Sequence, residues 1–246
     1  MGQYQTDALV LGVKNWGEAD KIITLLSREH GKITATAFGC RRPKSPLAGA
    51  LQMFNEVDIQ LTKGNRLDTV RQASLKHANR TMSTDFSAMA YGAFVAELAT
   101  NLAVEGFPQG DMYDKLLEVF DAFGSRNPRI AALAAAFQIL EFSGMQLSYE
   151  RCVRSGLDIE GDAFFSIQEG GALLPEMVQP DDKDIMEYPE AMRVFIGQLL
   201  KLNWLEKPAF KVSGSIMVQA EALLLGYLYS MFGKPMKSLK FIQQLG

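Results

Sequence analysis

The sequence has few residues of the kinds on which secreted proteins and many enzymes depend. Among 246 residues there are two cysteines, Cys40 and Cys152, and two histidines, His30 and His77. Two cysteines make no disulfide framework, which is typical of a reducing compartment. The first ten residues lack a basic stretch followed by an apolar one, and no apolar run reaches the roughly 18–20 residues that span a bilayer. The sequence therefore predicts a cytoplasmic protein with no membrane partner.

The common catalytic motifs are also missing. No glycine-rich loop ends in Gly-Lys-Ser/Thr, no dinucleotide fingerprint follows a strand, and no Gly-x-Ser-x-Gly or His-Glu-x-x-His pattern occurs. An acidic cluster of Asp181, Asp182 and Asp184 precedes a predicted helix, and we interpret it as charge that stabilises the helix N-terminus. We expect a protein that is not an enzyme and needs no cofactor. A metal-dependent hydrolase that uses these carboxylates is the distant alternative.

The charges that are present are unevenly divided along the chain. Residues 1–80 hold 12 Lys and Arg against 7 Asp and Glu, whereas residues 81–246 hold 13 against 21. A basic segment joined to an acidic one indicates two different tasks, and the basic segment is the one suited to polyanions.

The sequence pattern of the basic segment predicts β-structure. Short β-rich runs occur at residues 8–13, 22–26, 32–37, 56–62 and from 67 to 70 onward. In the fourth run Val57, Ile59 and Leu61 alternate onto one face. Five short strands bury a common face by closing on themselves, so we expect a small barrel of the OB type, with helical character only near residues 47–54.

The sequence pattern of the acidic segment predicts helices. Apolar residues at helical spacing predict helices at 85–105, 111–123, 128–144, 184–203 and 215–232. We expect Asp111 and Ser213 to cap their helices, Pro128 to occupy a first helical position, and Gly124 and Gly144 to end two helices.

Glycine turns and short β-rich runs at about residues 150–180 interrupt the helices and predict a small insert. The predicted architecture is thus α+β and multidomain. An OB-fold barrel occupies residues 1–80 and a helical domain with a β-rich insert occupies residues 81–246.

A basic loop after the third predicted strand is the most informative feature. Arg41, Arg42 and Lys44 place three cations within four residues, which attracts phosphate backbones. Phe38 and Trp16 supply faces on which bases stack. Further cations of the predicted barrel extend the surface as candidates of second rank: Lys14, Lys63, Arg66 and Arg71. On charge alone, a solvated surface loop is the competing interpretation.

Taken together these segments resemble the RecO family of bacterial recombination mediators. The resemblance is carried by the order and spacing of several short motifs: Ala8-Leu9-Val10-Leu11, Trp16-Gly17-Glu18-Ala19-Asp20, Leu25-Leu26-Ser27-Arg28-Glu29-His30-Gly31-Lys32, Ala37-Phe38-Gly39-Cys40-Arg41-Arg42-Pro43-Lys44-Ser45, Leu51-Gln52-Met53-Phe54, and Gly233-Lys234-Pro235-Met236-Lys237-Ser238 before Phe241. It spans nearly the whole chain.

The resemblance implies an N-terminal OB fold, a helical domain and a small zinc-binding insert. It implies a protein of the cytoplasm and nucleoid that binds single- and double-stranded DNA and anneals complementary strands. It also implies a complex with RecR, contact with the C-terminal tail of single-strand binding protein, and help in loading RecA in the RecFOR pathway. The alternative from another class is an interaction adaptor whose basic barrel never touches DNA.

The sequence departs from the family pattern at the insert. Many family members carry two Cys-x-x-Cys pairs there, the set that a tetrahedral structural zinc needs. The matching positions in this chain are Cys152, Ser155, Leu174 and Met177. Only one thiolate remains, and leucine, serine and methionine are unsuited to Zn²⁺. We therefore expect no structural zinc and an insert held by apolar packing of Leu174 and Met177.

Overall fold

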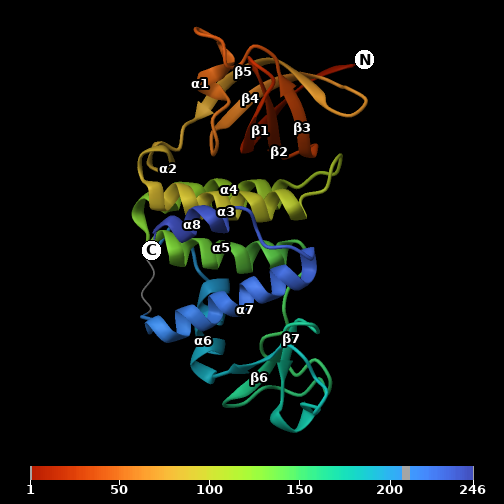
Figure 1. Cartoon of the computed structure of the whole chain (residues 1–246), viewed down its shortest axis with the longest axis vertical. Coiled ribbons are helices and arrows are strands. Elements are labelled where there is room, and N and C mark those ends of the chain that lie inside the picture. The colour runs from red at the N-terminus through yellow and green to blue at the C-terminus, as the bar shows by residue number, and fades with distance from the viewer. Residues whose placement is uncertain (1, 207–210, 246) are drawn as a thin grey trace. The chain divides into compact units, whose positions relative to one another are not determined.

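The computed structural model describes residues 2–206 and 211–245. The chain divides into two compact units, unit 1 (Met1–Pro128 with Lys240–Gly246) and unit 2 (Arg129–Leu239), and each is described by itself (Figure 1). The barrel and the helices that directly follow it therefore form one unit.

Unit 1 begins with a closed five-stranded barrel. Its strands are β1 (Gln3–Trp16), β2 (Asp20–Ser27), β3 (Gly31–Ala37), β4 (Glu56–Thr62) and β5 (Asp68–His77). They close in the order β1-β2-β3-β5-β4, and only the short β3–β5 pairing is parallel. One short helix, α1 (Leu47–Ala50), connects β3 to β4. The predicted OB-type barrel is confirmed, with β1 longer than the sequence pattern indicates.

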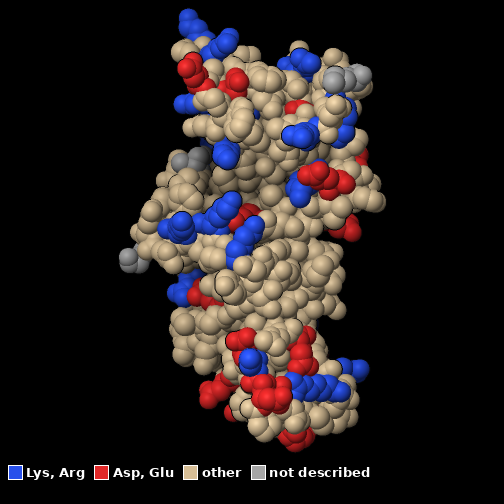
Figure 2. Space-filling view, turned by 45° about the vertical axis from the view of Figure 1, so that its right-hand side comes forward, with Lys and Arg blue, Asp and Glu red and all other residues tan. Residues whose placement is uncertain are grey.

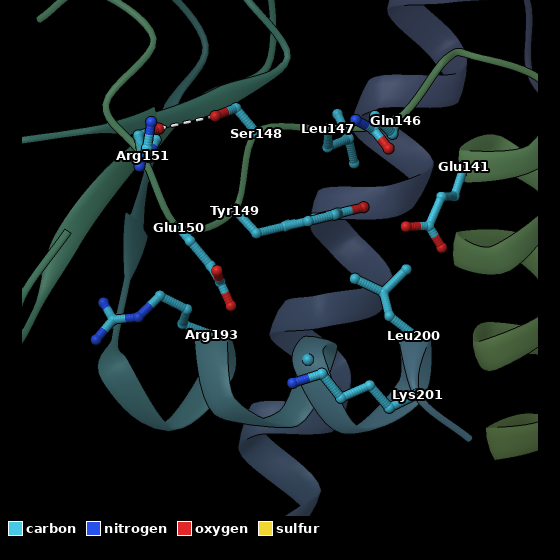
Figure 3. Close-up of a pocket in the computed structure, with 11 residues that line it drawn as sticks. Glu141, Gln146, Leu147, Ser148, Tyr149, Glu150, Arg151, Arg193, Leu200 and Lys201 are labelled. Atoms are coloured by element: carbon cyan, nitrogen blue, oxygen red, sulfur yellow. Dashed lines mark hydrogen bonds between the residues drawn. The ribbon is translucent and has the colours of Figure 1, made fainter. Parts of the chain in front are cut away.

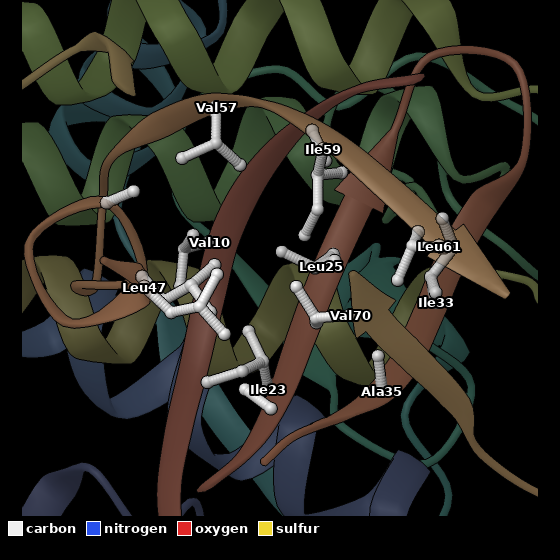
Figure 4. Close-up of a cluster of buried hydrophobic side chains, with 14 of the residues drawn as sticks. Val10, Ile23, Leu25, Ile33, Ala35, Leu47, Val57, Ile59, Leu61 and Val70 are labelled. Atoms are coloured by element: carbon white, nitrogen blue, oxygen red, sulfur yellow. The ribbon is translucent and has the colours of Figure 1, made fainter. Parts of the chain in front are cut away.

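The barrel encloses an apolar core to which every strand contributes (Figure 4). The predicted alternation of β4 is confirmed, because Val57, Ile59 and Leu61 all point inward and are fully buried. Alternation on β3 likewise buries Ile33 and Ala35 and turns the residues between them outward. The inward set fixes the register, so the outward set on each strand is fixed as well.

Helices cover part of the outer face of the barrel. They are α2 (Arg80–Thr84), α3 (Phe86–Leu102), α4 (Gly110–Ala122) and the 3₁₀ turn η1 (Phe123–Ser125). Leu9 and Leu26 lie opposite one another on β1 and β2 and are fully buried, yet they are not part of the barrel core. They lie where α3 meets β1 and α4 meets β2. The outer face is therefore apolar under the helices, and beyond them it carries polar side chains and a few exposed apolar ones.

The loop between α3 and α4 is bonded to the β2–β3 hairpin. The backbone N–H of Lys32 donates to the Val104 carbonyl at 3.0 Å, and that of Gly106 donates to the His30 carbonyl at 3.0 Å. Gly31 has φ +62°, and a Cβ there would lie 2.3 Å from the carbonyl oxygens of both Val104 and Phe107. Only glycine fits this contact, which fixes the helices against the barrel.

Two predictions about helix caps have opposite outcomes. Ser213 does cap its helix, since its hydroxyl accepts from the Ile216 N–H. Asp111 is not a cap, because α4 begins one residue earlier and Gln109 occupies the N-cap position. Asp111 lies in the first helical turn, where its charge still compensates the helix dipole.

The helices of unit 2 are α5 (Pro128–Phe142), whose first residue belongs to unit 1, α6 (Glu190–Leu200) and α7 (Gly214–Phe232). Helix α8 (Leu239–Ile242) begins at the last residue of unit 2 and otherwise belongs to unit 1. Pro128 begins α5 as predicted, and Gly144 follows its end with φ +70°. α7 is long and apolar enough to cross a bilayer by length and composition, although Glu221 within it pairs with Arg129.

The insert of unit 2 contains three strands, β6 (Ala163–Ser166), β7 (Gly171–Leu173) and β8 (Ile185–Tyr188), in the order β7-β6-β8, with the turn η2 (Pro175–Met177). The helix predicted at 184–203 is wrong in its first part, because β8 pairs with β6 there. The acidic cluster therefore precedes a strand, and its interpretation as helix-capping charge is also wrong. Asp184 has φ +56°, and the first-turn acid of α6 is Glu190.

A buried amide organises the packing of unit 2. Gln138 on α5 is 4% exposed, and its Nε2 donates to the carbonyls of Leu199 and Leu202 at 3.0 and 3.1 Å. Its Oε1 accepts from the indole N–H of Trp204 at 2.7 Å. One side chain thus satisfies the carbonyl end of α6 and positions Trp204.

We predict that Gln138→Met lowers the free energy of unfolding by about 2–4 kcal/mol, because the carbonyls and the indole N–H lose a buried partner. Urea unfolding checks this. Gln198→Met is the matched control, since Gln198 is exposed on α6 and its substitution should leave stability nearly unchanged. Equal midpoints for the two variants would contradict the role assigned to Gln138.

Candidate nucleic-acid interface

Two aromatic side chains stand on the outer face of the barrel beside the β1–β2 turn. Trp16 lies opposite Asp20, and Lys21 lies opposite Ala37, which places Phe38 next to Asp20 on the other side of β2. Trp16 is 55% exposed and Phe38 is 62% exposed. Since they flank one strand, their backbones lie about 10 Å apart, and both rings are available for stacking.

The loop that follows Phe38 is held against the β1–β2 turn. The backbone N–H of Arg41 donates to the Ala19 carbonyl at 2.8 Å, and its guanidinium donates to the Gly17 carbonyl at 3.1 Å. The Gly39 N–H donates to the Asp20 carboxylate at 2.7 Å. Cys40 is buried in the barrel core, where burial raises the pKa of its thiol. The basic loop therefore has a defined place beside the aromatic side chains.

The loop presents three cations, and Asp20 on β2 places one carboxylate between the two rings. Arg41, Arg42 and Lys44 are exposed, and none forms an ion pair with an acidic side chain among the described residues. Lys and Arg side chains also predominate in the space-filling view of the barrel (Figure 2). We call Trp16, Phe38, Arg41, Arg42 and Lys44 the aromatic–basic surface.

The other cations predicted from the sequence fall into two groups. Lys14 is exposed on β1 and pairs with Ile22 of β2, which in turn pairs with Thr36 of β3. Lys14 therefore lies in the cross-strand row next to the one that holds Trp16 and Phe38. Arg71 is exposed on β5, and its Nε donates to the Thr62 hydroxyl at 2.8 Å.

Lys63 and Arg66 lie elsewhere, in the β4–β5 loop. They line a cavity of about 530 Å³ together with residues from β1, the β2–β3 turn, β3 and the α3–α4 loop, among them Tyr4, His30, Lys32 and Thr34. Lys63 pairs with the buried Asp68 at 3.4 Å. Burial and the hydrogen bond to Asp68 raise the pKa of Tyr4.

The outer face of β3 runs from the row that holds Lys14 to the cavity beside Lys63 and Arg66. Lys32, Thr34 and Thr36 alternate outward along the strand, and Phe38 follows them at its end. Lys32 and Phe38 are six residues apart, which is roughly 20 Å of extended strand. Sequence reasoning missed Lys32, Thr34 and Thr36, although the period-two alternation of β3 is the signal that finds them.

Unit 2 contains a cavity of about 410 Å³ between α6 and the start of the insert (Figure 3). Its wall carries both signs of charge, with Arg193 and Lys201 on α6 and its end, and Glu150 on the insert side. The Tyr149 hydroxyl is buried with no hydrogen-bond partner in the described part of the chain, and burial raises its pKa well above its ordinary value.

The residues of the insert do not fit a structural zinc. Of the four matching positions only Cys152 offers a thiolate, and Leu174 offers no donor. No group of three or more His, Cys, Asp or Glu side chains among the described residues could hold a metal ion. Leu174 and Met177 are each only partly buried.

The Cys152 thiol itself is buried. Burial raises its pKa, but hydrogen bonds from the Ser155 hydroxyl and from the backbone N–H groups of Leu174, Ser155 and Arg154 outweigh burial and leave the pKa below its ordinary value.

Comparison with known proteins gives a consistent family assignment. A family model described as "Recombination protein O N terminal" matches residues 1–79, and one described as "Recombination protein O C terminal" matches residues 83–240. The boundary between the matches falls directly after the barrel.

Curated relatives agree over most of the chain. A protein of Symbiobacterium thermophilum named DNA repair protein RecO is 30% identical over 100% of this chain and 98% of its own length. Its namesake from Desulforamulus reducens is 27% identical over 98% of this chain and 94% of its own length. The protein of the same name from Pelotomaculum thermopropionicum is 35% identical over 70% of this chain and 68% of its own length. The chain therefore belongs to the RecO family of DNA repair and recombination proteins.

Proposed function

We propose that this protein is a non-enzymatic recombination mediator that binds single- and double-stranded DNA on the outer face of its barrel and anneals complementary strands. The observation that carries the proposal is the aromatic–basic surface: two exposed rings beside a fixed loop whose three cations form no ion pair among the described residues. Cations hold the phosphates and rings stack on the bases, which is how single strands are bound without sequence preference.

The position of this surface on the barrel supports the proposal. OB folds bind oligonucleotides across the face of their second and third strands, between the β1–β2 and β4–β5 loops. In this chain the β1–β2 turn carries Trp16 and contacts Arg41, and the β4–β5 loop carries Lys63 and Arg66. Both ends of the expected binding face therefore bear cations.

The charge of the covering helices limits where DNA binds in unit 1. Residues 81–128 hold 2 Lys and Arg against 7 Asp and Glu. Negative charge repels the phosphate backbone, so the helices direct DNA toward the uncovered part of the barrel. Annealing then needs no bond chemistry, because a surface that neutralises two strands and holds them close raises their effective concentration.

The remaining chain serves protein partners in this proposal. Unit 2 is acidic, with 10 Lys and Arg against 14 Asp and Glu over residues 129–239, which disfavours DNA there. Membership of the RecO family supports RecR and the C-terminal tail of single-strand binding protein as partners, and RecA loading in the cytoplasm, at the nucleoid, as the outcome.

We predict that Arg41→Ala/Arg42→Ala weakens binding of fluorescent single-stranded DNA and lowers the log–log salt slope by about 1.4, since each lost phosphate contact removes roughly 0.7. A salt titration measures both quantities. The matched control is Arg151→Ala/Lys183→Ala, which removes two exposed positive charges from the insert and should change neither. An unchanged slope in the barrel variant would favour the adaptor alternative.

Trp16→Ala/Phe38→Ala should weaken the same binding without changing the salt slope, because stacking contributes about 1–3 kcal/mol per base and releases no counterions. Fluorescence titration at two salt concentrations separates affinity from slope. Tyr229→Ala removes a ring of 58% exposure from unit 2 and is the control. Wild-type affinity in the double variant would exclude these rings from the interface.

A further inference from the structure

The guanidinium of Arg154 forms hydrogen bonds and ion pairs that join three segments of the insert. Arg154 lies between Cys152 and Ser155, in the first of the two loops where the family's zinc ligands would stand. Its Nε donates to the Glu169 carboxylate at 3.1 Å, and its Nη2 also pairs with Glu169. Glu169 belongs to the turn between β6 and β7, so this pair ties the first loop to the sheet.

The same guanidinium reaches the second loop. Nη1 donates to the Met177 carbonyl at 2.6 Å and to Asp182 Oδ2 at 2.9 Å, and Nη2 donates to Asp182 Oδ1 at 2.6 Å. Asp182 in turn accepts from the Gln179 backbone N–H at 2.7 Å, which closes the loop on itself. Asp182 and then Glu169 raise the pKa of Arg154, as a guanidinium between two carboxylates requires.

A second set of bonds joins the loops at Cys152. The backbone N–H of Val153, next to Cys152, donates to the Ala172 carbonyl on β7 at 3.0 Å, two residues before Leu174. The Gly156 N–H donates to the Cys152 carbonyl at 2.8 Å, and Gly156 has φ +72°, which makes the first loop a tight turn. The first loop is therefore tied to the second without a metal, through the backbone beside Cys152 and through the Met177 carbonyl that Arg154 binds.

We propose that Arg154 replaces a structural metal ion in this chain, holding the loop at 152–156 to the loop at 174–182 by ion pairs and charge-assisted hydrogen bonds. The planar fork of five donors suits this task, because it satisfies two carboxylates and a carbonyl at once. Lysine has a point charge and cannot reproduce it. The apolar packing of Leu174 and Met177 expected from the sequence is then a minor contribution.

Hydrogen exchange of the full chain tests the replacement. Arg154→Ala should raise amide exchange over residues 150–188 by roughly tenfold and leave residues 3–77 unchanged, because the loss is local. Arg151→Ala is the matched control: its ion pair with Asp158 lies in the same insert, with side chains 71% and 73% exposed, and should contribute little. Equal exchange in the two variants would overturn the proposal.

A second experiment restores the four cysteine ligands of a zinc site. In the Arg154→Ala background, Ser155→Cys/Leu174→Cys/Met177→Cys completes a set of four thiolates with Cys152. This variant should bind one zinc per chain by metal analysis, and zinc should return exchange over residues 150–188 to the wild-type rate. A folded variant that takes up no zinc would show that the four positions do not converge. Stoichiometric zinc in the purified wild-type protein would equally contradict the replacement.

Discussion

Barrel closure is the constraint on which the candidate interface depends. Once Val57, Ile59 and Leu61 fill the interior, every residue between inward positions on a strand must face outward. Alternation on β3 turns Phe38 outward, and on β1 the register shift between Val10 and Gly12 turns Trp16 outward on the other side of β2. The Arg41 backbone bond to Ala19 then fixes the basic loop beside them. A one-residue slip in register would bury the rings and lose the surface.

Helices and cations divide the outer face of the barrel between two tasks. Leu9 and Leu26 provide an apolar patch on which α3 and α4 pack, and Gly31 allows the loop between these helices to approach the β2–β3 hairpin. The uncovered remainder is polar and bears the cations. The proposed DNA interface and the helix packing therefore occupy neighbouring parts of one sheet surface.

The sequence is a good guide to local structure and a poor one to distant partners. The β4 bounds and the Ser213 cap follow from alternation and side-chain chemistry within a few residues. The capping role given to Asp182 and its neighbours fails because β8 forms by pairing with β6, a contact that no local pattern encodes. The role of Arg154 cannot be predicted from a local pattern for the same reason, since its partners lie 15 and 28 residues away in the sequence.

The most direct test of the account is photo-cross-linking of single-stranded DNA that carries photoreactive bases, followed by mapping of the cross-linked peptides. Stacked bases lie against the rings that hold them, so we expect cross-links at Trp16 and Phe38. Longer DNA should give further cross-links along β3. Cross-links confined to residues 129–239, with the barrel unmodified, would contradict it.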